Sequence, residues 1–204
     1  MKKIIFASLL CLIISGCSSS QKKGVDTVSK SSPEWKLDAD QKNFLHNKKP
    51  KYKTLVVYFS KTGNTQKIAY KIAVMLKGDI DRIIDLKNRG FCLGGGAAMF
   101  GMTADIGDMK YNPADYDLVI LGTPIWSWNM SPAMRAYIEK YKGKFKNLGF
   151  FVTAGGTAPG KIVKKMEKLT GKKGIAFTGF IEKEFKTPGV IQKRLNKFLL
   201  NFLK

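Results

Sequence analysis

The sequence is poor in histidine and cysteine, and this excludes several kinds of site. Its 204 residues include one histidine, His46, and three cysteines, Cys11, Cys17 and Cys92. His46 lies in a polar stretch before the first predicted strand, so neither a histidine-dependent catalytic triad nor a zinc site can be built around it. Cys11 and Cys17 lie close to the amino terminus. Cys92 is therefore alone in the rest of the chain, which excludes an internal disulfide framework.

Acidic residues are also scarce. The chain has 15 Asp and Glu against 36 Lys and Arg, which gives a formal net charge of +21. Such an excess is typical of proteins that meet nucleic acid, an anionic membrane surface or an acidic partner. No nucleic-acid motif accompanies the charge, and the lysines are spread along the whole chain. The composition therefore indicates either a solvated lysine-rich surface or contact with a membrane, and no nucleic acid.

The amino terminus has the pattern of an export signal. Met1-Lys2-Lys3 is followed by the apolar run Ile4 to Ile14, which is too short for a permanent membrane span. The run ends in Ile14-Ser15-Gly16-Cys17, which resembles the lipobox of bacterial lipoproteins. This resemblance implies that residues 1–16 are a cleaved signal peptide and that Cys17 carries lipid. We therefore expect the protein to be anchored to a membrane, outside the cytoplasm.

Residues 17–52 are rich in Ser, Lys and Asp and show no sustained apolar period, so we expect a lipid-anchored flexible tether. Its lysines, including Lys48 and Lys49, would hold it near anionic lipid. A few apolar side chains are consistent with a short helix that either docks on the following domain or lies on the bilayer. These are Trp35, Leu37, Phe44 and Leu45.

From residue 53 to residue 204, apolar runs alternate with amphipathic segments. Buried strands are predicted at Leu55–Phe59, Tyr116–Leu121 and Leu148–Val152, and further strands at Ile80–Ile84, at an edge, and Ile175–Thr178. This alternation predicts an α/β domain with a parallel sheet covered on both faces. Residues 87–113, with Gly94-Gly95-Gly96, are predicted to form either a partly helical flap or a poorly formed helix.

Three polar loops follow the predicted strands, and the carboxyl ends of parallel strands meet at one edge of a sheet. The first loop offers hydroxyls, an amide and the N–H groups of a helix start, which suit a phosphate. The second carries two tryptophans that suit stacking on a planar ligand. The third is rich in glycine. The candidate ligand-binding residues are Ser60, Lys61, Thr62, Gly63, Asn64 and Thr65; Thr123, Pro124, Ile125, Trp126 and Trp128; and Thr153, Gly155, Gly156 and Thr157.

The third loop also contains a possible false match. Gly155 to Lys161 fits the G-x-x-x-x-G-K core of a nucleoside-triphosphate loop. Ile162 stands where that motif needs Ser or Thr, and Pro159 removes an N–H that the phosphate would need. We therefore do not expect a nucleoside-triphosphate site.

Together the loops resemble those of the flavodoxin family. Val57 to Thr65 resembles its phosphate loop, and Gly122 to Trp126 resembles its second flavin loop, with Trp126 where the family places a stacking aromatic. Thr153 to Thr157 falls at the third loop. The resemblance covers residues 53–204. It implies a flavodoxin-like three-layer sandwich with a five-stranded parallel sheet of order 2-1-3-4-5, and FMN with its phosphate in the first loop.

The resemblance implies a redox function but leaves its form open. The third loop has no Tyr or Trp to cover the second flavin face, so a substrate could approach there. We expect a membrane-anchored FMN protein that transfers electrons to an unidentified redox partner protein or quinone. The alternative is an NAD(P)H-dependent quinone reductase that uses the open face. A third possibility is a surface-binding lipoprotein whose flavin site has decayed. No side chain is expected to act as a catalytic group or a metal ligand.

Overall fold

The structure is a computed structural model, and it describes residues 37–87, 91–156 and 159–204. The predicted signal peptide, Cys17, Trp35 and Thr157 lie outside these residues. Within the described ranges, no helix is long and apolar enough to cross a membrane.

Five parallel strands form the sheet, in the order β2-β1-β3-β5-β6, and a short sixth strand, β4, pairs antiparallel with the end of β3. With β4 set aside, this is the predicted order 2-1-3-4-5, and the flavodoxin-like fold is confirmed. The strands are β1 (Thr54–Tyr58), β2 (Asp79–Arg82), β3 (Leu118–Trp126), β4 (Asn129–Met130), β5 (Asn147–Ala154) and β6 (Ala176–Ile181).

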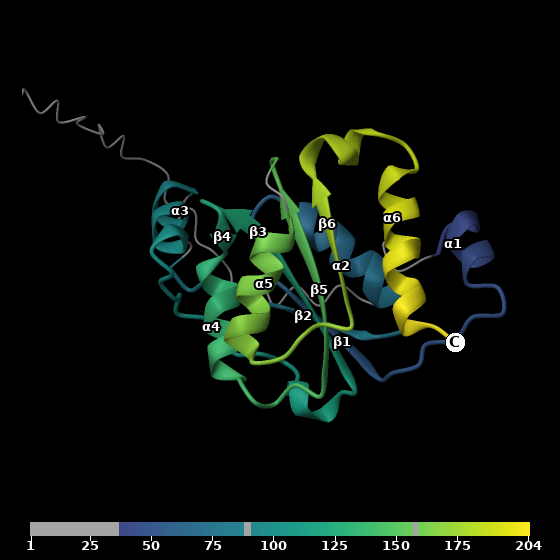
Figure 1. Cartoon of the computed structure of the whole chain (residues 1–204), viewed down its shortest axis with the longest axis horizontal. Coiled ribbons are helices and arrows are strands. Elements are labelled where there is room, and N and C mark those ends of the chain that lie inside the picture. The colour runs from purple at the N-terminus through teal and green to yellow at the C-terminus, as the bar shows by residue number, and fades with distance from the viewer. Residues whose placement is uncertain (1–36, 88–90, 157–158) are drawn as a thin grey trace, which may run out of the picture. The chain divides into compact units, whose positions relative to one another are not determined.

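Helices cover both faces of the sheet, as a parallel sheet requires (Figure 1). On one face lie α2 (Asn64–Met75) and α6 (Val190–Leu199). On the other lie α3 (Phe91–Met99), α4 (Pro132–Lys140) and α5 (Pro159–Thr170). The described residues also form three short 3-10 helices: η2 (Pro113–Asp115), η3 (Glu182–Lys186) and η4 (Leu200–Phe202).

The hydrophobic core has two layers, one on each side of the sheet. The inward face of α2 is formed by Ile68, Ile72, Met75 and Leu76, which are each at most 1% exposed. In α5, Ile162 and Met166 are buried and Leu169 packs against the same layer. All five side chains of β1 are buried, which is why this strand is a continuous apolar run rather than an alternating one.

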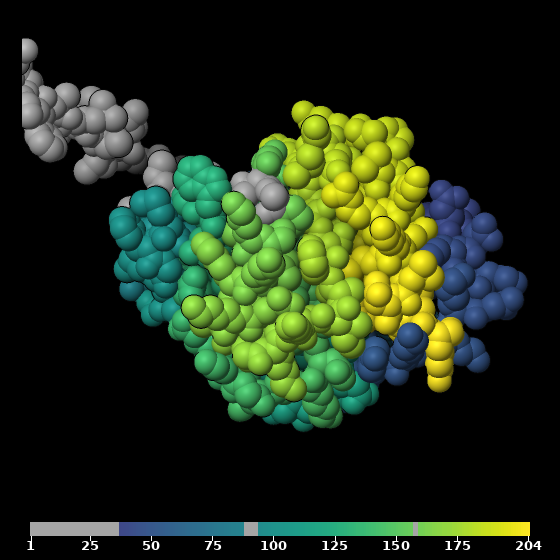
Figure 2. Space-filling model, in the orientation of Figure 1, coloured from purple at the N-terminus to yellow at the C-terminus, as the bar shows by residue number. Residues whose placement is uncertain are grey.

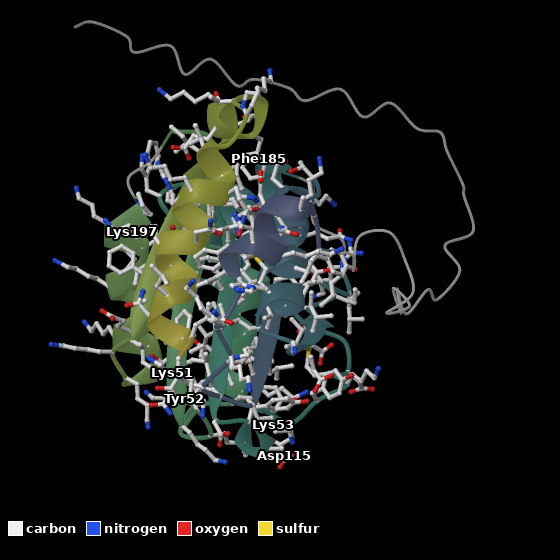
Figure 3. All side chains as sticks on the ribbon, turned by 90° about the vertical axis from the view of Figure 1, so that its right-hand side faces the viewer. Lys51, Tyr52, Lys53, Asp115, Phe185 and Lys197 are labelled. Carbon is white, nitrogen blue, oxygen red and sulfur yellow. The ribbon has the colours of Figure 1, made fainter. Side chains whose placement is uncertain are left out.

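Residues 37–52, assigned to the tether from the sequence, pack against the domain. The helix α1 (Ala39–Phe44) begins with a capping box between Asp38 and Gln41, and Leu37, Phe44 and Leu45 contact the core layer of α2 and α6. Figure 3 shows α1 beside these two helices. Of the two alternatives predicted for this segment, the structure has the helix docked on the domain.

The last residues of the chain hold this amino-terminal segment in place. Pro50 and Leu203 form an antiparallel bridge, and Lys49 and Lys204 exchange backbone hydrogen bonds of 2.9 Å in both directions. Residues 49–51 and 202–204 therefore lie side by side.

The glycine-rich segment forms a helix. In α3, Gly94 faces Trp126, and a Cβ at this glycine would lie 2.5 Å from the ring. A Cβ at Gly95 would lie 3.0 Å from Ser127 Oγ. Because glycine has no side chain, α3 can approach the end of β3 more closely than another residue would allow.

Candidate functional site

The first loop leaves the start of α2 open for an anion. Ser60 Oγ accepts a hydrogen bond from the Gly63 N–H at 3.1 Å, and Gly63 has a left-handed φ of 93°. Gly63 is the residue before α2, and no side chain caps the helix. The first N–H groups of an α-helix have no partner within the helix and carry partial positive charge. This 12-residue helix therefore offers a phosphate site at its amino end.

The remaining residues of the first loop surround this helix start. Lys61 and Thr62 are exposed, and Asn64 is half-buried. A Cβ added at Gly63 would meet no atom within 4 Å, so the space beside the loop is open. Thr65 is buried and turns towards the third loop rather than towards solvent.

The second loop is a β-hairpin. β3 continues to Trp126, which pairs with Asn129 of β4, so that only Ser127 and Trp128 form the turn. Both have positive φ, 43° and 58°. A two-residue turn with left-handed backbone at both positions is normally made by Asn-Gly, so this Ser-Trp turn is strained.

The two tryptophans of the hairpin lie in different surroundings. Trp126 is 5% exposed and packs edge-on against Phe59, with ring centroids 5.5 Å apart. Trp128, at the turn, is 70% exposed. The Trp126 ring belongs to the hydrophobic core. Its stacking on a planar ligand stays a prediction. Trp128 has the accessible ring.

Thr123 supports the hairpin from inside. Thr123 is fully buried, and its Oγ1 atom lies 3.0 Å from Ser131 Oγ in a hydrogen bond. The same Oγ1 atom accepts a hydrogen bond from the Ser131 N–H at 3.1 Å. This links β3 to the start of α4. Pro124 and Ile125 are half-buried at the outer end of β3.

The third loop meets the first directly. Thr153 Oγ1 lies 2.8 Å from Thr65 Oγ1 in a buried hydrogen bond. Gly155 and Gly156 are exposed, and a Cβ at either would meet nothing within 4 Å. This end of β5 is therefore open on the side of the glycines.

The three loops converge, as the topology predicts. The Phe59 N–H donates to the Gly122 carbonyl, and Pro124 is paired with Thr153 across the sheet. An open helix start, an exposed indole and open glycines suit a planar ligand with a phosphate group.

Two residues that the sequence analysis missed hold the hairpin. Lys165 Nζ of α5 donates to the Trp128 carbonyl at 3.2 Å, and Asn129 Nδ2 donates to the Ala98 carbonyl of α3 at 2.8 Å. The sequence did not indicate a hairpin here, because Ser-Trp is not a typical hairpin turn. Residues that hold the hairpin could therefore not be identified.

No family model and no curated protein matches this chain. Solved structures do resemble it. A flavoprotein from Lactobacillus acidophilus NCFM, in complex with FMN, is 21% identical, with a TM-score of 0.54 over 66% of this chain and 96% of its own. A protein from Bacteroides eggerthii DSM 20697, named "putative flavoprotein", is 25% identical, with a TM-score of 0.57 over 72% and 98%. A protein of the same name from Bacteroides uniformis ATCC 8492 is 23% identical, with a TM-score of 0.51 over 63% and 88%. These similarities support the flavodoxin-like fold.

Proposed function

We propose that this chain binds FMN and transfers electrons, as a flavodoxin-like protein held at a membrane outside the cytoplasm. The observation that carries the proposal is the uncapped start of α2, at the meeting point of three carboxyl-end loops. The likeness to an FMN-bound flavoprotein supports the same cofactor.

Different loops would bind the phosphate and the ring system of FMN. The N–H groups at the start of α2, with Ser60, Thr62 and Asn64, would hold the phosphate, and Lys61 adds positive charge beside it. Trp128 and the loop of Gly155 and Gly156 would hold the isoalloxazine, with Trp128 supplying a ring for stacking. When bound, FMN supplies the electron transfer itself. The chain then contributes binding, orientation and the charges that set the potential.

The test is the visible absorption spectrum of the purified protein, followed by titration with FMN. We expect a flavin spectrum, release of FMN rather than FAD on denaturation, and rebinding to the apoprotein at one FMN per chain. A colourless protein that takes up no added FMN would contradict the proposal and select the decayed-site alternative.

A second candidate is an NAD(P)H-dependent quinone reductase. The specific observation in its favour is the open third loop, because the described residues 153–156 place no aromatic ring over the second flavin face. Steady-state assays with NADH, NADPH and quinones separate the candidates. Turnover by the FMN-loaded protein alone favours the reductase, whereas its absence favours a carrier that needs a partner protein.

The membrane location rests on the lipobox-like sequence that ends at Cys17. Cys17→Ser removes the only thiol at which lipid can be attached in that motif. We expect the wild-type chain in the membrane fraction of a bacterial host and a large loss from that fraction for the variant. Equal membrane fractions would contradict lipidation at Cys17.

A further inference from the structure

The solvent face of α5 carries four lysines in one stripe, Lys161, Lys164, Lys165 and Lys168, here called the α5 lysine stripe. Their spacing of three, four and seven residues places them on the same side of the helix, over about 10 Å. All four are exposed, while the opposite side of α5 buries Ile162, Val163 and Met166.

No carboxylate balances this stripe among the residues that the structure describes. The ion pairs there join other basic side chains, such as Lys71 with Asp38 and Arg194 with Glu184. The single acid of α5, Glu167, accepts the Gly174 N–H at 2.9 Å and thus serves the following loop. Like charges three or four residues apart destabilise a helix, so an anionic surface bound here would relieve this repulsion.

Neighbouring loops extend the positive surface beyond one end of the stripe. Lys172 Nζ donates to the Lys146 carbonyl at 3.1 Å, which holds the loop after α4 against the loop after α5. Figure 2 shows α5 at the front of the molecule, beside α4. Further exposed lysines on these two loops and at the end of α4 are Lys140, Lys142, Lys144 and Lys173.

The same side of the sheet carries an exposed apolar turn after α3. Met99, Phe100 and Met102 are 54%, 77% and 57% exposed. Their neighbour Ala98 belongs to the core layer under α4 and α5, and a Cβ at Gly101 would lie 3.8 Å from the Arg135 guanidinium of α4. The apolar turn and the α5 lysine stripe therefore belong to elements on the same side of the sheet.

We propose that the α5 lysine stripe docks the domain on the anionic headgroups of a lipid bilayer, with the apolar turn 99–102 entering the interface. Lysines near an anionic leaflet and large apolar side chains beside them are the combination that binds a bilayer surface. The proposal deepens the membrane location above and rests on it, but it does not depend on FMN.

The test measures co-sedimentation of the full chain, carrying Cys17→Ser, with vesicles of phosphatidylcholine alone or mixed with phosphatidylglycerol. The stripe variant is Lys161→Gln/Lys164→Gln/Lys168→Gln, which keeps Lys165 at the Trp128 turn. The control, Lys186→Gln/Lys193→Gln/Lys197→Gln, removes the same charge from exposed lysines of η3 and α6. Figure 3 labels Lys197 on α6.

A lysine near an anionic surface contributes about fivefold to partitioning, so the stripe variant should bind the mixed vesicles roughly 100-fold more weakly than its parent. The control should lose no more than about threefold. Phe100→Ser should weaken binding in high salt as well as in low salt, because its contribution is apolar. FMN uptake, measured in parallel, should be unchanged in the lysine variants.

Three outcomes would overturn the proposal. Equal losses in the stripe variant and the control would show that only the net charge acts. No preference of the parent chain for the mixed vesicles would exclude a bilayer. Binding to polyglutamate without binding to vesicles would assign the stripe to an acidic protein instead. Failure of FMN binding alone would contradict the proposed function and leave the docking face standing.

Discussion

Gly94 of α3 lies directly against the indole of Trp126, so that a methyl group at position 94 would come within 2.5 Å of ring atom Cζ3. The same ring meets Phe59 at the end of β1. Three consecutive glycines are unfavourable in a helix, but the lack of a side chain at Gly94 is what allows α3 to pack against the hairpin.

Gly94→Ala should therefore destabilise the protein. The added methyl group forces the ring or the helix to move, and overpacking of this kind costs about 1–3 kcal/mol. Urea denaturation followed by circular dichroism measures the free energy of unfolding. The matched control is Gly96→Ala in the same helix, where a Cβ meets nothing within 4 Å. This variant should be neutral or gain up to about 1 kcal/mol, because alanine favours the helix. Equal effects at the two positions would contradict the packing role of Gly94.

Trp128→Gly should raise stability and weaken FMN binding. Its φ of 58° suits glycine, and its ring is exposed, so the change relieves about 1 kcal/mol of strain and leaves no cavity. Loss of a stacked ring should weaken FMN about 3- to 10-fold. Fluorescence titration measures the affinity and thermal unfolding measures the stability. Trp128→Phe, which keeps both ring and strain, should stay close to wild type. Unchanged FMN affinity in the glycine variant would remove Trp128 from the site.

Asp81 fastens the loop after α3 to the edge of the sheet. Its Oδ2 atom accepts the Lys110 and Tyr111 N–H groups at 2.8 and 3.1 Å. Asp81→Ala leaves both donors without their acceptor and should cost about 1–3 kcal/mol in the free energy of unfolding. Asp81→Asn keeps an oxygen for them and should cost less than about 1 kcal/mol. A loss in the asparagine variant as large as in the alanine variant would show that the charge itself is needed.

The difference in stability between wild type and Asp81→Asn should depend on pH. Burial raises the pKa of the Asp81 carboxyl above its ordinary value of 3.8, in spite of its backbone hydrogen bonds. The native state then binds this proton more tightly than the unfolded state. The cost of the buried charge is present above the native pKa and disappears as the pH falls through it. Denaturation at a series of pH values should show wild type gaining stability relative to Asp81→Asn as the pH falls towards 4.

Tyr137→Phe should be neutral or stabilising by about 1 kcal/mol. Tyr137 of α4 is fully buried, and its hydroxyl has no hydrogen-bond partner within the described part of the chain. An unpaired buried hydroxyl is costly, and its removal leaves the ring packing intact. Tyr116→Phe is the contrast, because the Tyr116 hydroxyl donates to Asp79 Oδ2 at 3.0 Å, and it should cost about 1 kcal/mol. Chemical denaturation that ranks the two variants in the opposite order would contradict this account.

The sequence predicted the fold well because its signals are local and periodic. The inward face of α2 and the buried runs of β1 and β5 follow directly from apolar spacing. The strand order came from the resemblance of the loops. The apolar run predicts that β3 ends at Leu121, because Gly122 and Pro124 are typical of turns. The strand instead continues to Trp126, where the returning β4 pairs with it.

Less of the candidate site could be predicted. The left-handed Ser127-Trp128 turn lacks the usual Asn-Gly signature, so the sequence could not show which tryptophan is exposed. The hydrogen bond between Thr65 and Thr153 joins residues 88 positions apart, and no local pattern encodes such a contact. The same limit applies to residues 37–52, which pack on α2 and α6 and pair through residues 49–51 with the last residues of the chain.

The pairing of residues 49–51 with residues 202–204 determines how the domain would bear mechanical force. A pull through the residues before Leu37 would first peel α1 from α2 and α6. It would next meet the backbone hydrogen bonds that join residues 49–51 to residues 202–204. Only after these gave way would tension reach β1 and the loop at its end. The docked segment would therefore protect the ligand site from force applied at any amino-terminal attachment.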